Sequence, residues 1–447
     1  MPSGKAIRGL FAFLLAGTLM WTLPEAAPIA AETGGPPAET PPPAAIGADA
    51  PDAYRIVVLG DSIGVGYEPG AAAESDLYGY ADRLYEQTLL RGRAELANYA
   101  ILGLRTEGLI RQLQGAAERK SLPASALQDF SAYGDPRISR QAETVAAKGP
   151  ELLADLAAAD LVAITIGGND FLGFIRGVLA MPAEEAEQTL KADIETILNN
   201  YAEHAETAVR LVHALAPNAS IELSDQYLPF PRQTNADLYD LLTGSVGQLS
   251  ADLDALAAKL QAEGIPLRIV HIGSAFAGYE LSMTHMFADQ DVHPNQNGYN
   301  AIAEAFAKTA WNAYVKLVPA DRGTAASPAA PAIYVDGKPL VTAYKPKLRG
   351  GATFLPLRDI ADATGAQVSW DGKTKTALFR KNGREVAIAI GSKTLRVDGA
   401  EKPLAAPAYL EKAGSERKTY VPLAAIASGL DYQVVYRPKL YTVFIHS

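Results

Sequence analysis

The chain has 447 residues, of which 48% are hydrophobic and 20% charged, a composition typical of a globular protein with more than one domain. Its formal net charge of −10 offers no basic surface to nucleic acid, and we exclude that class of partner. It contains no cysteine, which excludes disulfides, thiolate metal sites and cysteine nucleophiles.

Residues 1–31 follow the order of a secretory signal peptide. Lys5 and Arg8 precede an apolar run over residues 10–23, and small residues continue through Ala31. A run of about 14 apolar residues is short for a hydrocarbon core of about 30 Å, which disfavours an uncleaved membrane anchor. We therefore predict a secreted or cell-surface protein with no stable membrane span after cleavage.

A linker rich in proline, alanine and glycine is predicted over residues 32–51, and a first domain over residues 52–318. In that domain we expect strands at residues 56–59, 94–100, 161–166, 220–223 and 267–272, and helices at residues 78–90, 183–214, 235–262 and 297–316. Strands that alternate with helices predict a parallel sheet with helices on both faces.

Four polar motifs stand where apolar runs end. In chain order they are Gly60-Asp61-Ser62, Asn98 with Gly103, Gly167-Gly168-Asn169-Asp170, and Asp291-Val292-His293-Pro294-Asn295. The carboxyl ends of parallel strands share one edge of a sheet, and ligands bind there. A serine hydroxyl becomes a useful nucleophile when a base removes its proton and N–H donors stabilise the oxyanion. We assign these roles to Ser62 as nucleophile, to His293 as base, and to Gly103, Asn169 and the Ser62 N–H as an oxyanion hole.

This set of motifs resembles the GDSL/SGNH hydrolase family over residues 54–316. The family's serine, glycine, asparagine and histidine blocks map onto Ser62, Gly103, Asn169 and His293. The resemblance implies an esterase-type hydrolase with a flavodoxin-like, three-layer α/β/α sandwich and with no metal or other cofactor.

The acid of the site is where the chain departs from the family pattern. The family usually places it three residues before the histidine, and that position here is Gln290. Asp291 and Asp289 flank Gln290, and either could orient His293, as could a backbone carbonyl. We choose Asp291 as the third catalytic residue.

Two other hydrolase classes fit parts of the sequence. Residues 60–64 satisfy the G-x-S-x-G pattern of the α/β-hydrolase nucleophile elbow. We reject the elbow because no strand precedes residues 56–59 to complete its oxyanion hole.

A metal-dependent hydrolase is the second class, since His285, Asp289, Asp291 and His293 offer nitrogen and oxygen ligands within nine residues. No H-E-x-x-H or comparable spacing supports it, and the alternative for His285 and Asp289 is a solvated or substrate-facing loop. Asp61 and Asp170 are expected to be turn formers or helix caps.

A second linker, rich in proline and alanine, is predicted over residues 319–331, and an α+β repeat domain of short strands and helices over residues 332–447. Val335-Asp336-Gly337 returns as Val397-Asp398-Gly399, Phe354-Leu-Pro-Leu357 as Tyr420-Val-Pro-Leu423, and Val368-Ser-Trp370 as Val434-Val-Tyr436. We expect the repeats to share one core, made by Leu355, Leu357, Ile360 and Trp370 with Val421, Leu423, Ile426 and Tyr436.

This second domain resembles the stalk-type domain of the copper amine oxidase N-terminus. That family is common on secreted proteins of Gram-positive bacteria, usually as an accessory module, which implies such a source and a cell-wall or surface ligand. No histidine lies between residues 332 and 445, so the resemblance implies no metal site.

Together these features predict a secreted serine esterase of the lipase type. It would cleave a small-molecule or polymer-borne ester, a lipid or an O-acylated glycan, through an acyl-enzyme. The alternative is a non-catalytic cell-surface binding protein built on the hydrolase fold. The displaced acid and the accessory domain favour that alternative, whereas intact Ser62, Asn169 and His293 argue against it.

Overall fold

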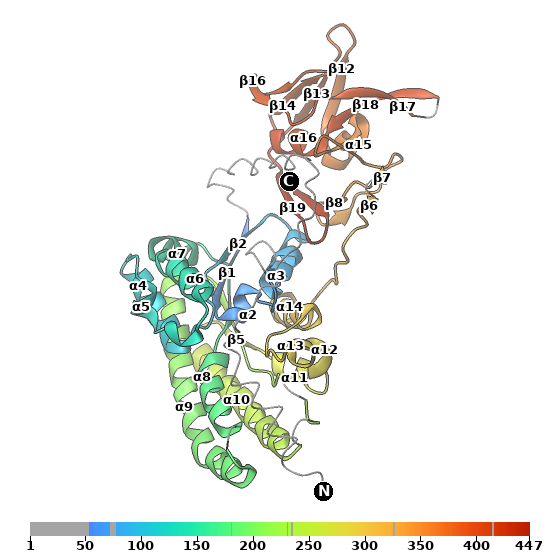
Figure 1. The fold of residues 1–447 in the computed structure, drawn as a ribbon. Coiled ribbons are helices and arrows are strands. Elements are labelled where there is room, and N and C mark those ends of the chain that lie inside the picture. Colours follow the sequence, from blue (N-terminus) through green and yellow to red (C-terminus); the bar gives the residue numbers. More distant parts are fainter. Residues whose placement is uncertain are drawn as a thin grey trace. The chain divides into compact units, whose positions relative to one another are not determined.

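The computed structural model describes residues 53–71, 77–179, 181–229, 231–233, 236–324, 327–413 and 415–447 (Figure 1). The predicted signal peptide and the first linker lie outside the described residues. The described chain forms two compact units, one with residues 55–85 and 95–314 and the other with residues 53–54, 86–94 and 315–447.

A five-stranded parallel sheet organises the first unit. Its strands are β1 (Tyr54–Gly60), β2 (Ala94–Asn98), β3 (Leu161–Thr165), β4 (Ser220–Ser224) and β5 (Leu267–Val270), in the spatial order β2-β1-β3-β4-β5. Ile56 of β1 lies opposite Leu161 of β3, and Leu161 lies opposite Ser220 of β4. All five residues of β3 are buried, as expected for a central strand covered on both faces. The predicted parallel sheet is confirmed.

Helices cover both faces of this sheet (Figure 1). The longer helices are α3 (Tyr80–Leu89), α4 (Thr106–Ala117), α6 (Pro136–Ala146), α7 (Gly149–Ala157), α8 (Gly168–Leu179), α9 (Ala183–Leu215), α10 (Ala236–Ala262) and α14 (Gln296–Trp311). The short helices are α2 (Ser62–Val65), α5 (Ala124–Leu127), α11 (Ile272–Phe276), α12 (Glu280–Met283) and α13 (Met286–Asp289).

The side chains of β1 point alternately to the two faces of the sheet, and helices pack on each face. Val57 and Leu59 belong to the large core that includes side chains of α4, α7, α9 and α10. On the other side of the sheet, Tyr80 of α3 stacks on Phe306 of α14 with ring centroids 4.7 Å apart. This is the three-layer α/β/α sandwich that the sequence predicts. Helix α14 is shorter than expected, because Asn312 takes a left-handed conformation and caps it.

The second unit is built from short strands. They are β6 (Gly323–Thr324), β7 (Ser327–Pro328), β8 (Ala332–Val335), β9 (Lys338–Pro339), β10 (Lys347–Arg349), β11 (Ala352–Pro356), β12 (Gln367–Asp371), β13 (Thr376–Lys381), β14 (Arg384–Ala389), β15 (Thr394–Val397), β16 (Ala400–Pro403), β17 (Tyr409–Ala413), β18 (Glu416–Pro422), β19 (Gln433–Arg437) and β20 (Thr442–His446). They form the sheets β10-β11-β18-β17, β12-β13-β14-β15-β16, β19-β20-β8-β9 and β6-β7, with helices α15 (Leu357–Thr364) and α16 (Leu423–Gly429).

The sequence repeat is visible in the turns and pairing of this unit. Asp336 and Gly337 both have positive φ, 45° and 75°, and so do Asp398 and Gly399, at 49° and 84°. Two consecutive residues with positive φ make a two-residue hairpin turn, which explains why Asp-Gly recurs. The equivalent strands β11 and β18 pair with each other, with Leu355 opposite its counterpart in the other repeat, Val421.

The two repeats share one core, which contains Leu355, Ile360, Val421, Leu423 and Ile426, with Leu357 packed against it. The expectation was wrong for the two aromatic residues, since Trp370 is 43% exposed and Tyr436 is 48% exposed. Each shares a strand face with a valine two residues earlier, Val368 or Val434, and these valines do pack against the core. The aromatic side chains therefore lie further along the strands, where the core ends.

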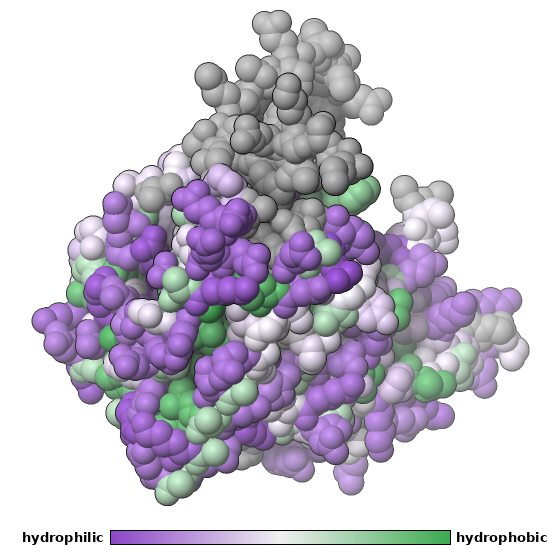
Figure 2. Space-filling view, turned by 90° about the horizontal axis from the view of Figure 1, so that it is seen from below, coloured by the Kyte–Doolittle hydropathy of each residue, from purple (hydrophilic) through white to green (hydrophobic). Residues whose placement is uncertain are grey.

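None of the described helices is long and apolar enough to cross a membrane. The face in Figure 2 is mostly hydrophilic, and its hydrophobic residues form scattered patches rather than a continuous belt.

Candidate active site

Ser62 lies where β1 ends and α2 begins. Gly60 has a φ of +122°, and a Cβ at this position would come within 1.9 Å of the Thr165 carbonyl oxygen on β3. Glycine therefore lets the chain turn sharply at the edge of the sheet. Asp61 then caps α2, with its Oδ1 accepting the Ile63 N–H at 3.0 Å. These two residues place the Ser62 hydroxyl at the carboxyl edge of the sheet.

The structure brings His293 and Asp291 to Ser62. His293 Nε2 lies 2.8 Å from Ser62 Oγ, and His293 Nδ1 lies 2.6 Å from Asp291 Oδ1. The same carboxylate oxygen accepts the backbone N–H of His293 at 2.8 Å. This local turn lets an aspartate only two residues before the histidine reach its ring. A carboxylate, an imidazole and a hydroxyl in this order have the arrangement of a proton-transfer triad.

The surroundings of this triad keep the acid ionised and the imidazole oriented. Burial raises the pKa of Asp291, but hydrogen bonds from His293 outweigh that effect and hold the pKa below its usual value. The ring of Tyr67 meets the His293 ring edge-on, with centroids 4.6 Å apart. Tyr227 donates a hydrogen bond from its hydroxyl to the Val292 carbonyl at 2.9 Å and so supports the same loop.

The other two predicted blocks also meet at this edge. Asn169 Nδ2 donates to the Leu104 carbonyl at 3.0 Å, in the turn that contains Gly103. Gly103 has a φ of +75°, and a Cβ there would come within 2.7 Å of the Tyr133 ring. The Gly103 carbonyl accepts hydrogen bonds from Tyr133 Oη and Gln128 Nε2.

The backbone N–H groups of Ser62 and Gly103 are the two main-chain donors of the predicted oxyanion hole. Within the described part of the chain, no residue accepts a hydrogen bond from the N–H of Ser62 or of Gly103. Both donors are therefore free for an oxyanion, and the Asn169 amide carries a second N–H besides the one that it donates to Leu104.

The two aspartates expected as caps have different roles. Asp61 caps α2 as expected, and burial raises its pKa to about 7, with the nearby Asp170 adding to the shift. Asp170 lies in the first turn of α8 but caps another helix, because its carboxylate accepts the N–H and the hydroxyl of Thr106 at the start of α4. It thereby connects the turn of Gly103 to the turn of Asn169.

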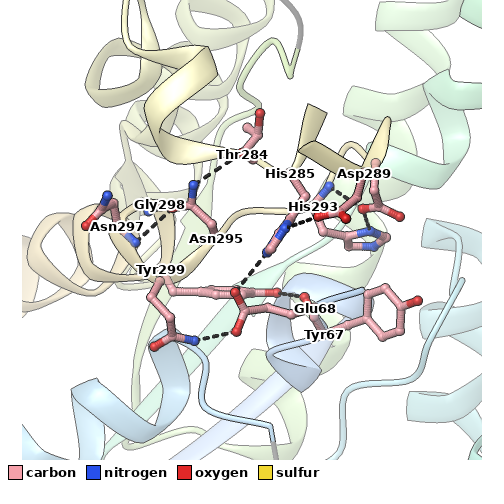
Figure 3. Close-up of polar contacts among 12 residues, drawn as sticks. Tyr67, Glu68, Thr284, His285, Asp289, His293, Asn295, Asn297, Gly298 and Tyr299 are labelled. Atoms are coloured by element: carbon pink, nitrogen blue, oxygen red, sulfur yellow. Dashed lines mark hydrogen bonds and ion pairs between the residues drawn. The ribbon is translucent and has the colours of Figure 1, made fainter. Parts of the chain in front are cut away.

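Asp289 is exposed, as expected for a solvated loop, whereas His285 is held between two carboxylates. His285 Nδ1 lies 2.7 Å from Asp289 Oδ2, and His285 Nε2 lies 2.9 Å from Glu68 Oε1 (Figure 3). Its side chain is only 19% exposed. Among the described residues, no three His, Cys, Asp or Glu side chains are arranged to hold a metal ion. Sequence reasoning missed Glu68 and Tyr67, which follow α2 in a segment without a recognisable motif.

A second group of serine, histidine and aspartate lies at the ends of β4 and β5. Ser250 Oγ donates to Asp225 Oδ2 at 2.8 Å, and His271 Nδ1 lies 3.0 Å from Ser250 Oγ and 3.2 Å from Asp225 Oδ2. His271 Nε2 faces Asp254 at 3.4 Å. Because the serine proton already goes to a buried carboxylate, this group cross-links α10 to the sheet rather than forming a second triad.

Comparison with known proteins agrees with the resemblance seen in the motifs. The model of the copper amine oxidase N-terminal domain matches residues 334–445. A comparison with curated proteins finds no match. Similar solved structures include the lipase Lip_vut3 from a goat rumen metagenome, at 17% identity and a TM-score of 0.40, covering 58% of this chain and 98% of that chain. An extracellular lipase from Streptomyces rimosus has 18% identity and a TM-score of 0.38, covering 57% of this chain and 100% of that chain.

A third similar structure is phospholipase A1 from Streptomyces albidoflavus NA297, at 16% identity and a TM-score of 0.39, covering 58% of this chain and 100% of that chain. The family model of the GDSL-like lipase/acylhydrolases matches residues 56–306, which is more than half of the chain. The protein therefore belongs to the GDSL-like lipase/acylhydrolase family.

Proposed function

We propose that this protein is a secreted serine esterase that cleaves a lipid or an O-acylated glycan through an acyl-enzyme on Ser62. The observation that carries the proposal is the line of hydrogen bonds from Asp291 through His293 to Ser62. Each of these three groups has the partner that its role in nucleophilic catalysis requires.

In this mechanism, His293 Nε2 takes the Ser62 proton while Oγ attacks the ester carbonyl carbon. The N–H groups of Ser62 and Gly103 and the Asn169 amide then stabilise the negative charge on the carbonyl oxygen. Asp291 stabilises the imidazolium that forms at His293. Collapse of the tetrahedral intermediate releases the alcohol, which takes the proton from His293. Water then cleaves the acyl-enzyme, with His293 again as the base.

Secretion and the substrate class are further parts of the proposal. Secretion is supported by the order of charged, apolar and small residues in residues 1–31. A polymer-borne or lipid ester is supported by the accessory domain, for which we propose a cell-wall or surface ligand.

The test is hydrolysis of p-nitrophenyl acetate and butyrate by the purified full chain and by its Ser62→Ala variant. We expect the substitution to lower kcat by on the order of 10⁴- to 10⁶-fold, with an unchanged circular dichroism spectrum. Prior treatment with a chelator is expected to leave the rate unchanged. A loss of less than tenfold in Ser62→Ala contradicts the nucleophile. An inert native chain that still binds a polymeric ester supports the non-catalytic binding protein instead.

A further inference from the structure

The loop that carries the base begins at His285. We call residues 285–293 the histidine loop; Thr284 and Pro294 form an antiparallel bridge at its base. The His285 N–H donates to the His293 carbonyl at 2.9 Å, and the His285 carbonyl accepts the Asp289 N–H at 2.8 Å. The backbone of His285 is therefore hydrogen-bonded directly to the residue that faces Ser62.

The side chain of His285 points out of this loop to the segment that follows the nucleophile. Its Nε2 contacts Glu68 Oε1 at 2.9 Å (Figure 3). The other carboxylate oxygen of Glu68 accepts a hydrogen bond from Gln296 Nε2 at 2.5 Å, and Gln296 Oε1 accepts one from Arg83 at 2.6 Å. Glu68 is thus held by α14 and α3 while it contacts the histidine loop.

Tyr67, the neighbour of Glu68, belongs to the same connection. Its ring packs on His293, and its carbonyl accepts a hydrogen bond from the Tyr299 hydroxyl at 2.5 Å. The Tyr67 N–H donates to the Ser62 carbonyl at 3.1 Å, so this segment is also fixed to the nucleophile. The contact between Glu68 and His285 therefore joins the part of the chain that holds Ser62 to the part that holds His293.

Both ring nitrogens of His285 face carboxylate oxygens, and this decides which form of the ring fits. A carboxylate only accepts hydrogen bonds, a neutral imidazole donates one, and an imidazolium donates two. Only the imidazolium satisfies Glu68 and Asp289 together. Burial lowers the pKa of His285, but the two carboxylates outweigh it and the pKa lies above its usual value. Asp291 is the third acid nearby, and the charge of His285 helps to lower its pKa.

We propose that His285 is a positioning residue of the active site, which as an imidazolium between Glu68 and Asp289 holds the histidine loop against the segment of the nucleophile. The distance at which His293 takes the Ser62 proton then depends on this contact. The inference rests on the proposed function of Ser62 and His293. It adds a pH dependence that the triad alone does not have, because a neutral His285 can keep only one of its two carboxylate partners.

The sign of that dependence follows from the raised pKa of His285. The cation, and with it the contact, is present below this pKa and is lost as the pH rises through it. Activity therefore declines on the alkaline side as the histidine loop loosens. A variant that lacks the contact is loose at every pH, so the ratio of native to variant activity falls as the pH rises.

The experiment compares the native chain with His285→Gln and Glu68→Gln from about pH 6 to about pH 10. One readout is kcat/KM on p-nitrophenyl butyrate. The other is the rate at which a fluorophosphonate labels Ser62, a reaction in which an Oγ–P bond forms, fluoride leaves and His293 takes the proton. Near neutral pH we expect both variants to be about 10- to 100-fold slower than the native chain, since small misplacements of catalytic groups cost that much. At the alkaline end the ratio should approach one, and the double variant should be no slower than either single variant by more than about twofold.

The matched control is His271→Gln, because His271 also lies between two carboxylates but belongs to the cross-link between α10 and the sheet. It should follow the native chain at every pH. A ratio that stays constant with pH, or losses in the two variants that multiply, overturns the positioning role. Failure of the proposed function is recognised separately, as a native chain that neither hydrolyses the ester nor reacts with the fluorophosphonate.

Discussion

The two units of the molecule differ in what they bury. The first unit buries the carboxylates Asp61, Glu222, Asp225 and Glu280. In the second unit, the buried polar side chains of the described residues from 315 to 447 are Thr364, Thr419, Gln433, Thr442 and His446, and none is an acid. Its segment 86–94 contributes one buried carboxylate, Glu86, which lies 3.0 Å from Arg437. Burying a carboxylate costs free energy unless it is paired or neutralised. The first unit has more of these acids, and two of them, Asp61 and Asp225, directly follow a strand.

Two raised pKa values show the free-energy cost of burying carboxylates in the first unit. Burial raises the pKa of Asp61 to about 7 and the pKa of Glu222 to about 8, although Arg268 lies 2.9 Å from Glu222. In the second unit, by contrast, equivalent strands of the two repeats pair across Leu355 and Val421 over one apolar core. The comparison shows that most of the buried carboxylates belong to the unit with the candidate site, whereas the second unit is built mainly on the apolar core that its repeats share.

Apart from the loss of Ser62, the largest effect in the first unit is expected from the loss of Asp291, the acid that we assign to catalysis. Asp291→Asn should lower kcat/KM on a p-nitrophenyl ester by about 10²- to 10⁴-fold, because the imidazolium of His293 loses its carboxylate partner. Asp289→Asn is the matched control and should cost less than about tenfold, since the Asp289 side chain contacts His285 and not His293. Small effects of both would indicate that a backbone group orients His293, and a larger loss at Asp289 would reverse our assignment.

The second unit should respond to a packing change in stability and not in activity. Ile426 of α16 is fully buried in the shared core, so Ile426→Ala should cost about 2–5 kcal/mol of local stability. Trp370→Ala is the control and should cost less than about 0.5 kcal/mol, because Trp370 is 43% exposed. Amide hydrogen exchange of peptides from α16 and β18 measures both effects in the full chain. Loss of esterase activity in Ile426→Ala, with β1 still protected from exchange, would show that the second unit supports the chemistry.

The first unit should carry a pH dependence of stability that comes from Asp61. Its pKa is raised to about 7 from 3.8, so the folded state binds more protons than the unfolded state between these values. The contribution of Asp61 to stability is therefore greatest at low pH and falls as the pH rises, by about 2–3 kcal/mol between about pH 5 and about pH 8. Asp61→Asn keeps a cap acceptor and should remove the part of the slope that comes from Asp61, as measured by exchange of β1 amides. The part that comes from Glu222, whose pKa is raised to about 8, should remain. An unchanged slope would assign the dependence to another acid.

The sequence predicts the arrangement of both units because their signals are local and repeated. Apolar runs specify the strands at residues 56–59 and 161–166, and the polar motifs that end the runs locate Ser62 and Asn169 at one edge. In the second unit three recurring motifs predict a repeat, and the structure shows that both recurring Asp-Gly pairs form turns in which each residue has positive φ.

What sequence reasoning missed depends on contacts between distant segments. Glu68 has no motif, and its contact with His285 follows from the path of two loops that are far apart in the chain. Trp370 shows a different limit. Alternation along β12 indicates which face it shares with Val368, but not how far the core extends beneath that face. No element is predicted for residues 118–160, where the short helices α5, α6 and α7 are held by tertiary packing.

The hydrogen bond between Ser62 and His293 spans 231 residues of sequence. A ribosome builds the chain from its N-terminus, so Ser62 emerges long before His293. At about 5–20 residues per second, the interval lasts roughly 10–50 s. The contact between Ser62 and His293 cannot form during this time. The order of synthesis therefore sets the earliest moment at which the candidate triad can assemble.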